Sequence, residues 1–468
     1  MSAERSADIP VREKERGLSN PLYGRLENPP ACLVGNSGED RGMKIDEFQF
    51  PSDWSLGPIA GCFDFTTKPR GLDLSKNGDE IPFFPMDQIP LGRIRVSEFT
   101  PKPLSQLGSG TYVENGDLMV AKITPSFENG KQAIVDIETD FAYATTEVIP
   151  MRGRNGESDT LFLFFYLLHP EVRSDLAGKM EGSTGRQRLS KTVLGDRFIP
   201  LPPLPEQKKI AHILSTVQRA IEAQERIIQT TTELKKALMH KLFTEGLRNE
   251  PQKQTEIGPV PESWEVVELG SLAKVGNGST PKRANEAYWE GGTIPWLNST
   301  KIHDRFITEA DQFVTPQAVK ECHLPKVAPN SLLIAITGQG KTLGNSAITR
   351  IETCINQHLA YAQFHAAKIV PDFVLWFMQT RYDYLRAIAH GGGSTKGALT
   401  CGFLKTLPIP VPSRAEQEEI ATTFQTLEDK QHFAVRKQAA LQDIFRTLLH
   451  QLMTAKTRVH GISIGANT

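Results

Sequence analysis

The segment IPLPPLPEQKKIA at residues 199–211 returns as IPVPSRAEQEEIA at residues 409–421. The matching glutamates of the two segments are 210 residues apart. Far upstream, the motif PSDW at residues 51–54 returns as PESW at residues 261–264, again 210 residues later. Two unrelated landmarks that share one spacing indicate that the chain contains two copies of the same structural unit.

Between these landmarks the two copies keep the same order of features. Each contains a segment typical of a buried strand, then an apolar segment that follows an aspartate, then a loop rich in Gly, Ser, Thr and basic residues. In chain order these features lie at residues 116–124, 159–168 and 182–191 in the first copy and at residues 330–337, 372–378 and 391–400 in the second. Each copy is therefore predicted to form a mixed α/β globule, followed by a proline-rich exit and a helix.

The two exits lead into the clearest helical patterns of the sequence, each about 40 residues long, or roughly 60 Å of α-helix. Pro205 suits the first turn of the first helix, and Ser413, three residues before Glu416, forms a capping box for the second. Apolar residues recur at heptad spacing and in the same phase along both helices. They are Ile210, Leu214, Val217, Ile221, Leu238 and Leu242 in the first helix, and Ile420, Phe424, Leu427, Leu441, Leu448 and Leu452 in the second.

These stripes allow two interpretations. Each helix could pack as a core helix on its own globule, as heptad-like stripes often do. Alternatively, the two helices pair with each other, because helices of this length outrun a globule of about 150 residues and matching phases suit an antiparallel partner. We favour pairing, although Gln224, Thr231 and Lys235 interrupt the first stripe.

The sequence therefore predicts an α+β protein with two tandem mixed α/β domains. Two long helices that pair as an antiparallel coiled coil separate the domains, and the duplication gives pseudo-twofold symmetry. The expected parts are an N-terminal polar arm at 1–45, a first domain at 46–204, a first helical spacer at 205–247, a linker at 248–260, a second domain at 261–412, a second helical spacer at 413–456 and a C-terminal tail at 457–468.

The composition excludes several classes of protein. The first twenty residues lack the apolar run of a signal peptide, and the longest apolar stretch, residues 161–168, is too short to span a bilayer. We therefore expect a cytoplasmic protein without a membrane partner. The five cysteines are scattered without a C-x-x-C pair, and the eleven histidines show no ligand spacing. Neither a disulfide framework nor a metal site nor a cofactor is expected.

Three motifs around the exits resemble a known family. They are the exit PLPEQKKIA at 203–211, the helix end KKALMHKLFTEG at 235–246 and the opening IGPVPESW at 257–264. Together with the segment GNGSTP at 276–281, they look like the DNA-specificity subunits of type I restriction-modification systems. The resemblance covers residues from about 50 to 455 and includes the 210-residue duplication. The second helix departs from it, since MTAK at 453–456 replaces the family's Phe-Thr-Glu-Gly ending.

The resemblance implies a division of labour. Such subunits hold two target-recognition domains apart with a pair of antiparallel helices, and each domain reads one half of an asymmetric, bipartite site on double-stranded DNA. The helices act as a ruler and dock two modification (methyltransferase) subunits. Adenine methylation and ATP-dependent cleavage are carried by these and by restriction (motor-nuclease) subunits. The chain itself is then a non-catalytic subunit.

A net charge of −1 is low for a protein that binds DNA on its own, so a partner could supply much of the phosphate binding. Within the chain, the basic and polar loops are the candidate DNA contacts, because arginine can read guanine while lysine and serine usually hold phosphates. The alternative is that these residues are ordinary solvated charges. The candidates are Arg186, Arg188, Lys191, Lys282, Arg283, Lys341, Ser394 and Lys396.

Three other functions were weighed. The segment AITGQGKT at 335–342 fits a loose phosphate-loop pattern, but a predicted strand follows it instead of a helix, so a β-turn that presents Lys341 is favoured over a nucleotide site. The segment NPPA at 28–31 lacks the aromatic residue of the adenine-methyltransferase motif. A scaffold whose two globules bind proteins instead of DNA is the remaining rival.

Overall fold

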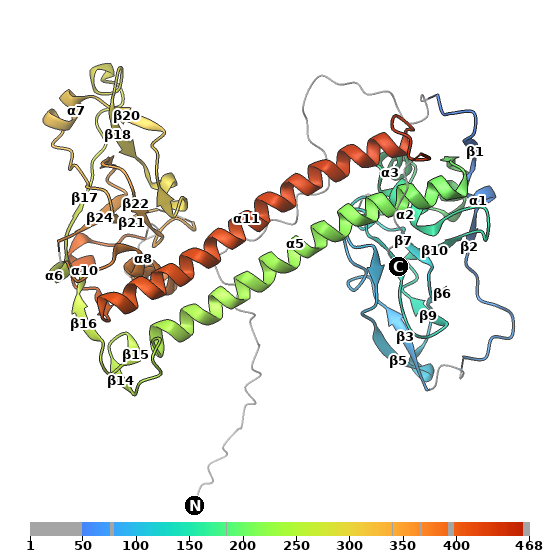
Figure 1. The fold of residues 1–468 in the computed structure, drawn as a ribbon, viewed down its shortest axis with the longest axis horizontal. Coiled ribbons are helices and arrows are strands. Elements are labelled where there is room, and N and C mark those ends of the chain that lie inside the picture. Colours follow the sequence, from blue (N-terminus) through green and yellow to red (C-terminus); the bar gives the residue numbers. More distant parts are fainter. Residues whose placement is uncertain are drawn as a thin grey trace, which may run out of the picture. The chain divides into compact units, whose positions relative to one another are not determined.

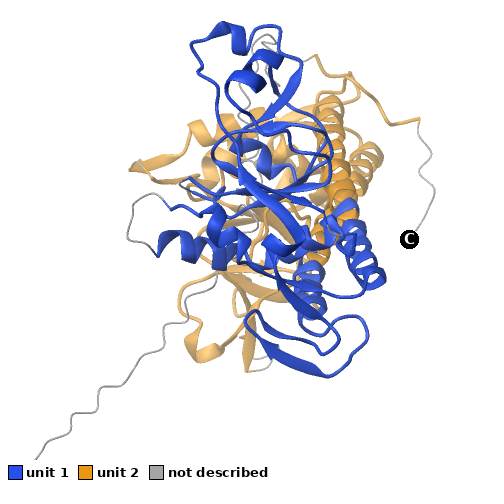
Figure 2. Cartoon of the chain, turned by 90° about the vertical axis from the view of Figure 1, so that its left-hand side faces the viewer, with its two compact units in different colours: residues 1–28, 232–429 blue, residues 29–231, 430–468 orange. Residues whose placement is uncertain are grey.

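A computed structural model describes residues 49–74, 79–183, 185–338, 340–365, 367–391 and 397–461. The predicted arm at 1–45 and the loop residues Ser394 and Lys396 lie outside these ranges. The chain falls into two compact units (Figure 2). Among the described residues, unit 1 holds Thr232–Asp429 and thus the second repeat, and unit 2 holds those before Thr232 and after Asp429, with the first repeat.

Both units are built around a five-stranded sheet with the same strand order. Figure 1 labels several of these strands in each unit. In unit 2 the order is β2 (Phe63–Phe65), β10 (Val148–Gly153), β7 (Leu118–Ala121), β8 (Gln132–Val135) and β4 (Arg95–Val96). In unit 1 it is β17 (Ala273–Asn277), β24 (Leu359–Phe364), β21 (Ser331–Ala335), β22 (Ser346–Thr349) and β19 (Phe306–Ile307). The last strand in each order, β4 or β19, pairs with its neighbour in parallel, and the other pairs are antiparallel.

A second, smaller sheet in each unit carries the main difference between the repeats. Unit 2 has four strands in the order β5 (Thr100–Pro103), β3 (Glu80–Phe84), β9 (Phe141–Ala144) and β6 (Thr111–Glu114). Unit 1 has three, in the order β20 (Gln312–Val314), β18 (Ile294–Leu297) and β23 (Cys354–Ile355). At the place of β6, the described part of unit 1 has only the isolated bridge between Val327 and Thr353.

The predicted apolar segments form buried helices that pack on the larger sheets. These are α2 (Thr160–Leu168) and α8 (Pro371–Thr380), whose aromatic residues lie in the two main cores. Asp159 caps α2 through a hydrogen bond from the Phe162 amide, at 2.8 Å. Each helix is followed by a second one, α3 (Pro170–Gly178) or α9 (Tyr382–His390). The two units therefore repeat the same mixed α/β globule.

Short elements close each globule at the point where the long helix leaves. They are α1 (Ile59–Cys62), α4 (Lys191–Asp196) and the pair β1 (Ser55–Pro58) with β13 (Phe198–Leu201) in unit 2, and α6 (Leu269–Leu272), α10 (Cys401–Lys405) and the pair β16 (Glu265–Glu268) with β25 (Pro408–Val411) in unit 1. In unit 1 the residues predicted as a linker contain the hairpin β14 (Gln252–Thr255) and β15 (Gly258–Pro261).

The long helices are α5 (Leu204–Thr244) and α11 (Arg414–Met453), with 41 and 40 residues. In unit 2, Leu214 near the start of α5 shares a core with Leu452 near the end of α11. In unit 1, Phe243 at the end of α5 stacks on Phe424 near the start of α11, with ring centroids 5.9 Å apart. The helices therefore pair in antiparallel fashion, and the predicted fold class is confirmed.

The twelve residues expected to pair the helices occupy different environments. In the cores lie Ile210, Leu214, Leu242, Ile420, Phe424 and Leu452, and Ile221 is also buried. Leu238, Leu427 and Leu448 are half-buried against a core, and Val217 and Leu441 are half-buried along the helices. Two of the polar interruptions, Gln224 and Thr231, are buried within the same stripe.

The glutamines of the repeated Glu-Gln motif make the same buried hydrogen bonds in both units. Gln207 and Gln417 are fully buried. The side-chain oxygen of Gln207 accepts from the Asp159 amide and that of Gln417 from the Val370 amide, at 2.9 and 2.8 Å. Their amide groups donate to Pro202 and Pro412 carbonyls in the preceding exits. Each glutamine thus joins the exit, the long helix and the segment that enters α2 or α8.

The adjacent glutamates bind the tryptophans of the other repeated landmark. The indole N–H of Trp54 donates to Glu206 at 3.2 Å, and that of Trp264 donates to Glu416 at 3.3 Å. Glu416 also accepts from the Leu247 amide just beyond α5, while Ser413 accepts from the Glu416 amide as the cap of α11.

In unit 2 the segment after α11 contacts the start of α5. Arg458 donates to both oxygens of Glu206 at 2.8 Å and to both oxygens of Asp53 at 2.6 and 3.1 Å. The hydrogen bond from Arg458 holds the pKa of the Asp53 carboxyl below its usual value. The residues that follow each long helix therefore bind the glutamate that starts the other. In the described part of the chain, no helix is both long and apolar enough to cross a membrane.

Removal of a motif glutamine tests this junction. We expect Gln417→Leu to lower the free energy of unfolding by about 2–4 kcal/mol, because the Val370 amide and the Pro412 carbonyl lose their buried partner. Thermal unfolding measures the change. Gln317→Leu, on an exposed face of a short helix, is the matched control and should cost under about 0.5 kcal/mol. Equal effects of the two substitutions would contradict the structural role of Gln417.

A histidine pair in unit 2 predicts an acid-sensitive step. His169, which is 2% exposed, lies with its Nε2 atom 3.3 Å from Nδ1 of His450 on α11. Burial, with His450 and Arg197 nearby, lowers the pKa of His169 to about 4. Burial and Lys456 also lower the pKa of His450, against the effect of Glu171.

Since the unfolded chain takes up a proton on His169 near pH 6.5 and the folded chain only near pH 4, stability is lost as the pH falls through this window. We expect the wild-type chain to lose on the order of 3 kcal/mol more than His169→Phe between pH 7 and pH 4. Denaturant unfolding across this range measures the difference, and parallel pH profiles for the two proteins would refute it.

Candidate nucleic-acid interface

In each unit the ends of four sheet strands meet at one face. In unit 2, β7 ends at Ala121 beside Val148, where β10 begins, and the end of β2 at Phe65 lies opposite Met151 on β10. In unit 1, β21 ends at Ala335 beside Leu359, where β24 begins. We call these the strand-end faces, and each includes the loops that leave and enter the strands there.

A basic hairpin is attached to the strand-end face of unit 2. Its strands are β11 (Glu181–Ser183) and β12 (Arg186–Arg188). The Thr124 amide donates to the Gln187 carbonyl at 3.0 Å, and the Leu189 amide donates to the Lys122 carbonyl at 2.7 Å. The loop after β7 therefore fixes the base of the hairpin and places Arg188 at the face.

A groove of about 510 Å³ opens on this face. Lys122, Arg188, Lys191 and Glu181 are the charged residues among those that line it. Glu147 accepts from Arg188 at 2.9 and 3.0 Å, and this contact lowers the pKa of the Glu147 carboxyl. The carboxylate holds the Arg188 guanidinium in one orientation, which suits recognition of a planar base edge.

The other two candidates of unit 2 differ in their surroundings. Lys191 lies on α4 with its Nζ atom 4.5 Å from the centre of the Phe65 ring, where the face begins. Arg186 is exposed near the tip of the hairpin. The structure thus brings Arg186, Arg188 and Lys191 to one face and adds Lys122, which the sequence analysis missed.

Hydroxyl, amide and imidazole side chains meet at the strand-end face of unit 1. His358 lies with Nδ1 2.5 Å from the Thr337 hydroxyl, and His303 lies with Nε2 3.1 Å from the Thr342 hydroxyl. Gln357, next to His358, accepts a hydrogen bond from Thr280. These residues come from four separate loops, so no single sequence motif predicts that they lie together. Alignment of the repeats, with the rule that loops at strand ends carry binding residues, is the signal that could have found them.

Lys341 is exposed on the loop between β21 and β22 of this same face. The loop is held by hydrogen bonds to the Lys341 carbonyl from Tyr382 at 2.7 Å and from Asn345 at 3.0 Å. It runs from strand to strand, so no helix N-terminus follows to bind a phosphate group. The geometry therefore does not support a nucleotide site around Lys341.

Lys282 and Arg283 contact residues of, or close to, the smaller sheet of unit 1. The Arg283 guanidinium lies 3.8 Å from the Trp289 ring centre and donates to Gln312 on β20 at 2.7 Å. Lys282 is exposed, and its carbonyl accepts from the Trp289 indole. Ser394 and Lys396 lie outside the described residues.

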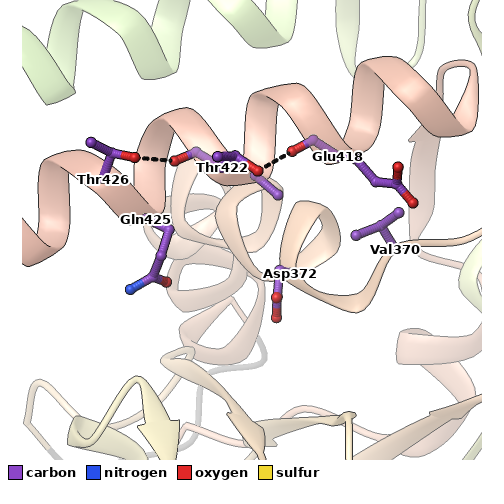
Figure 3. Close-up of a pocket in the computed structure, with 7 residues that line it drawn as sticks. Val370, Asp372, Glu418, Thr422, Gln425 and Thr426 are labelled. Atoms are coloured by element: carbon purple, nitrogen blue, oxygen red, sulfur yellow. Dashed lines mark hydrogen bonds between the residues drawn. The ribbon is translucent and has the colours of Figure 1, made fainter.

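Figure 3 shows a different hollow of unit 1, about 270 Å³ in volume, between the start of α8 and the first turns of α11. Asp372 in it pairs with Arg350 at 2.8 and 2.9 Å. The hydroxyls of Thr422 and Thr426 donate to carbonyls one turn earlier in α11. These groups are already occupied, so the hollow offers no activated nucleophile.

The sequence of the chain matches the family described as "Type I restriction modification DNA specificity domain" over residues 51–232 and again over residues 261–442. The chain belongs to this family. The two matches start 210 residues apart, which is the offset of the internal repeat. Specificity subunits are the non-catalytic members of their complexes, so the chain is a non-catalytic DNA-recognition subunit of a type I restriction-modification system.

Individual relatives of this family agree over most of the chain. A chain assigned as the MjaX type I restriction enzyme specificity subunit of Methanocaldococcus jannaschii is 25% identical over 440 residues, covering 90% of this chain and 97% of the relative. The Escherichia coli EcoR124I/EcoR124II specificity subunit is 25% identical and covers 62% of this chain and 70% of its own. The crystal structure of the type I S subunit from M. genitalium shares the fold, with a TM-score of 0.55, 17% identity and coverage of 90% and 98%.

The lysines of the unit 2 groove provide a test of this specificity-subunit interface. We expect Lys122→Gln with Lys191→Gln to weaken binding of the assembled complex to its DNA site by roughly tenfold at 0.1 M salt, and to reduce the slope of log affinity against log salt by about two. Titration of labelled duplex at several salt concentrations measures both. Lys179→Gln, at an exposed lysine directly after α3, is the control. An unchanged salt slope in the double variant would place the DNA elsewhere.

Proposed function

We propose that this chain reads two different half-sites of double-stranded DNA, one with each strand-end face. The observation that carries the proposal is that one scaffold displays two different sets of side chains at the same place. In unit 2 the face holds Lys122, Arg188 and Lys191, and in unit 1 it holds His358 and Lys341 with neutral polar groups. Two similar scaffolds with different reading groups suit an asymmetric, bipartite site.

The chemistry of the two faces fits base recognition combined with phosphate contact. An arginine held by a carboxylate, such as Arg188, can donate two hydrogen bonds to guanine, while Gln357 offers both a donor and an acceptor for adenine. Exposed lysines near them hold phosphates without regard to sequence. In this proposal Lys122, Arg186 and Lys191 in unit 2, and Lys282 and Lys341 in unit 1, are the phosphate contacts. Arg283 is a support for the smaller sheet.

The proposal assigns the chemistry to partner subunits. Two modification subunits dock on the paired helices and methylate adenine within the half-sites, and restriction subunits cleave DNA at the expense of ATP. The net charge of −1 supports this division, because much of the phosphate neutralisation then comes from the partners. The measurements therefore use the assembled complex.

Domain exchange tests the two-reader proposal. The structure offers matched boundaries, because residues 59–197 lie between β1 and β13 and residues 269–407 lie between β16 and β25. Each segment is replaced in turn by the equivalent segment of another specificity subunit, with both long helices kept. We expect each exchange to change one half of a bipartite methylation motif and to leave the other half, because each face reads alone.

Single-molecule sequencing of adenine methylation in cells that carry the chain and its modification partner gives the motif directly. The two exchanges are controls for each other, since they must alter opposite halves. If both variants assemble but neither changes the methylation pattern, the domains do not read DNA and a protein-binding scaffold replaces this proposal.

A further inference from the structure

A buried charged cluster joins both long helices to the globular domain of unit 1. Lys235 on α5 and Glu428 on α11 form an ion pair. Both residues are buried, with exposed surface fractions of 2% and 7%. Glu428 also pairs with Arg305, which directly precedes β19 of the larger sheet. The Lys235 Nζ and Arg305 Cζ atoms lie 4.6 and 5.0 Å from the ring centre of Trp376 on α8. One carboxylate therefore contacts a neighbouring helix and the domain at once.

Unit 2 fills the two equivalent helix positions with uncharged side chains, and the half-buried Glu222 on α5 accepts from the Ile94 backbone amide of the domain at 3.4 Å. At the repeat offset of 210 residues, Phe445 corresponds to Lys235 and Gln218 corresponds to Glu428. Phe445 packs on Phe165, with ring centroids 6.0 Å apart, and the Gln218 amide donates to the Gly92 carbonyl. Phe165 corresponds to Trp376, because each lies six residues after the backbone amide bound by the motif glutamine. The same scaffold thus fills these two positions with uncharged groups, so packing alone does not require the ions.

The charges of unit 1 carry a cost. Burial, together with Arg305, lowers the pKa of Lys235 to about 8, and the ion pair with Glu428 offsets only part of this effect. Buried ion pairs are often no more stabilising than well-packed apolar residues, and their best-attested use is to fix one register or one arrangement. Here a slide between the helices, or a rotation of the domain on them, would leave Lys235 or Glu428 buried without a partner.

We propose that Lys235, Glu428 and Arg305 are positioning residues that hold the second recognition domain in one orientation on the helix pair, so that the complex discriminates strictly between correct and incorrect half-site spacing. The inference rests on the proposed reading of a bipartite site. Unit 2 has the uncharged Phe445 and Gln218 at the positions of Lys235 and Glu428, so the strictness comes from unit 1.

The test measures spacing discrimination in the assembled complex. Methylation sequencing with the wild-type chain first defines the two half-sites and their spacer. Methylation rates are then compared on duplexes with the native spacer and with spacers one base pair shorter or longer. We expect Lys235→Met and Glu428→Gln each to reduce the ratio of these rates by about tenfold, since the domain can then shift at low cost. Lys235→Arg, which keeps the charge and the contact with Trp376, should stay within about twofold of the wild type.

Two further variants separate position from stability. Lys235→Met with Glu428→Leu replaces the ions by apolar groups, and we expect an unchanged or higher Tm together with loss of spacing discrimination. Phe445→Leu in unit 2 is the matched control, with a lower Tm and discrimination retained. Retained discrimination in the stable double variant would overturn the inference. If the wild-type complex methylates no bipartite motif at all, it is the proposed function that fails.

Discussion

The junction between each long helix and its domain depends on two adjacent side chains, a glutamate and a glutamine in the first turn. The Gln207 and Gln417 amides bind backbone groups on both sides, in the exit before the helix and in the segment that enters the buried helix α2 or α8. The glutamates bind a tryptophan at the start of the domain and residues that follow the other long helix. Since these groups are buried, a lost partner costs far more than a surface contact would.

This dependence explains how much of the fold could be predicted. The motif and the tryptophan were the two landmarks that revealed the duplication, and they are also the two ends of one hydrogen-bonded junction. The heptad stripes predicted the long helices because apolar periodicity records burial directly. The buried strands β7 and β21 were predicted for the same reason. The segments of α2 and α8 were recognised only as apolar, because their helical conformation was not predicted. The strand order of the sheets could not be predicted, because a local sequence pattern does not indicate which strands pair.

The site was harder to predict because its residues meet only in the folded chain. Arg188 could be selected as a basic loop residue, but its partner Glu147 lies 41 residues away on the loop before β10. Thr337 comes from the loop between β21 and β22, and its partner His358 comes from the loop between β23 and β24. Arg283 is exposed, as expected of a candidate contact, but the sequence did not show that its guanidinium lies 3.8 Å from the centre of the Trp289 ring. Lys235 looked like an interruption in a stripe, whereas it is an ion pair inside the stripe.

The separation between scaffold and face also bears on how one fold serves different DNA sites. The scaffold contacts are made by backbone groups and by a two-residue motif, so they do not depend on the loops at the strand ends. The face residues bind one another or a loop backbone, as Arg188 and Glu147 do, and such contacts can change without disturbing the sheet. Under the proposed function, a chain built in this way alters one half-site at a time. The orientation of each face on the helices must then be preserved. The proposed means in unit 1 is buried charge, whereas unit 2 has aromatic packing at the equivalent place.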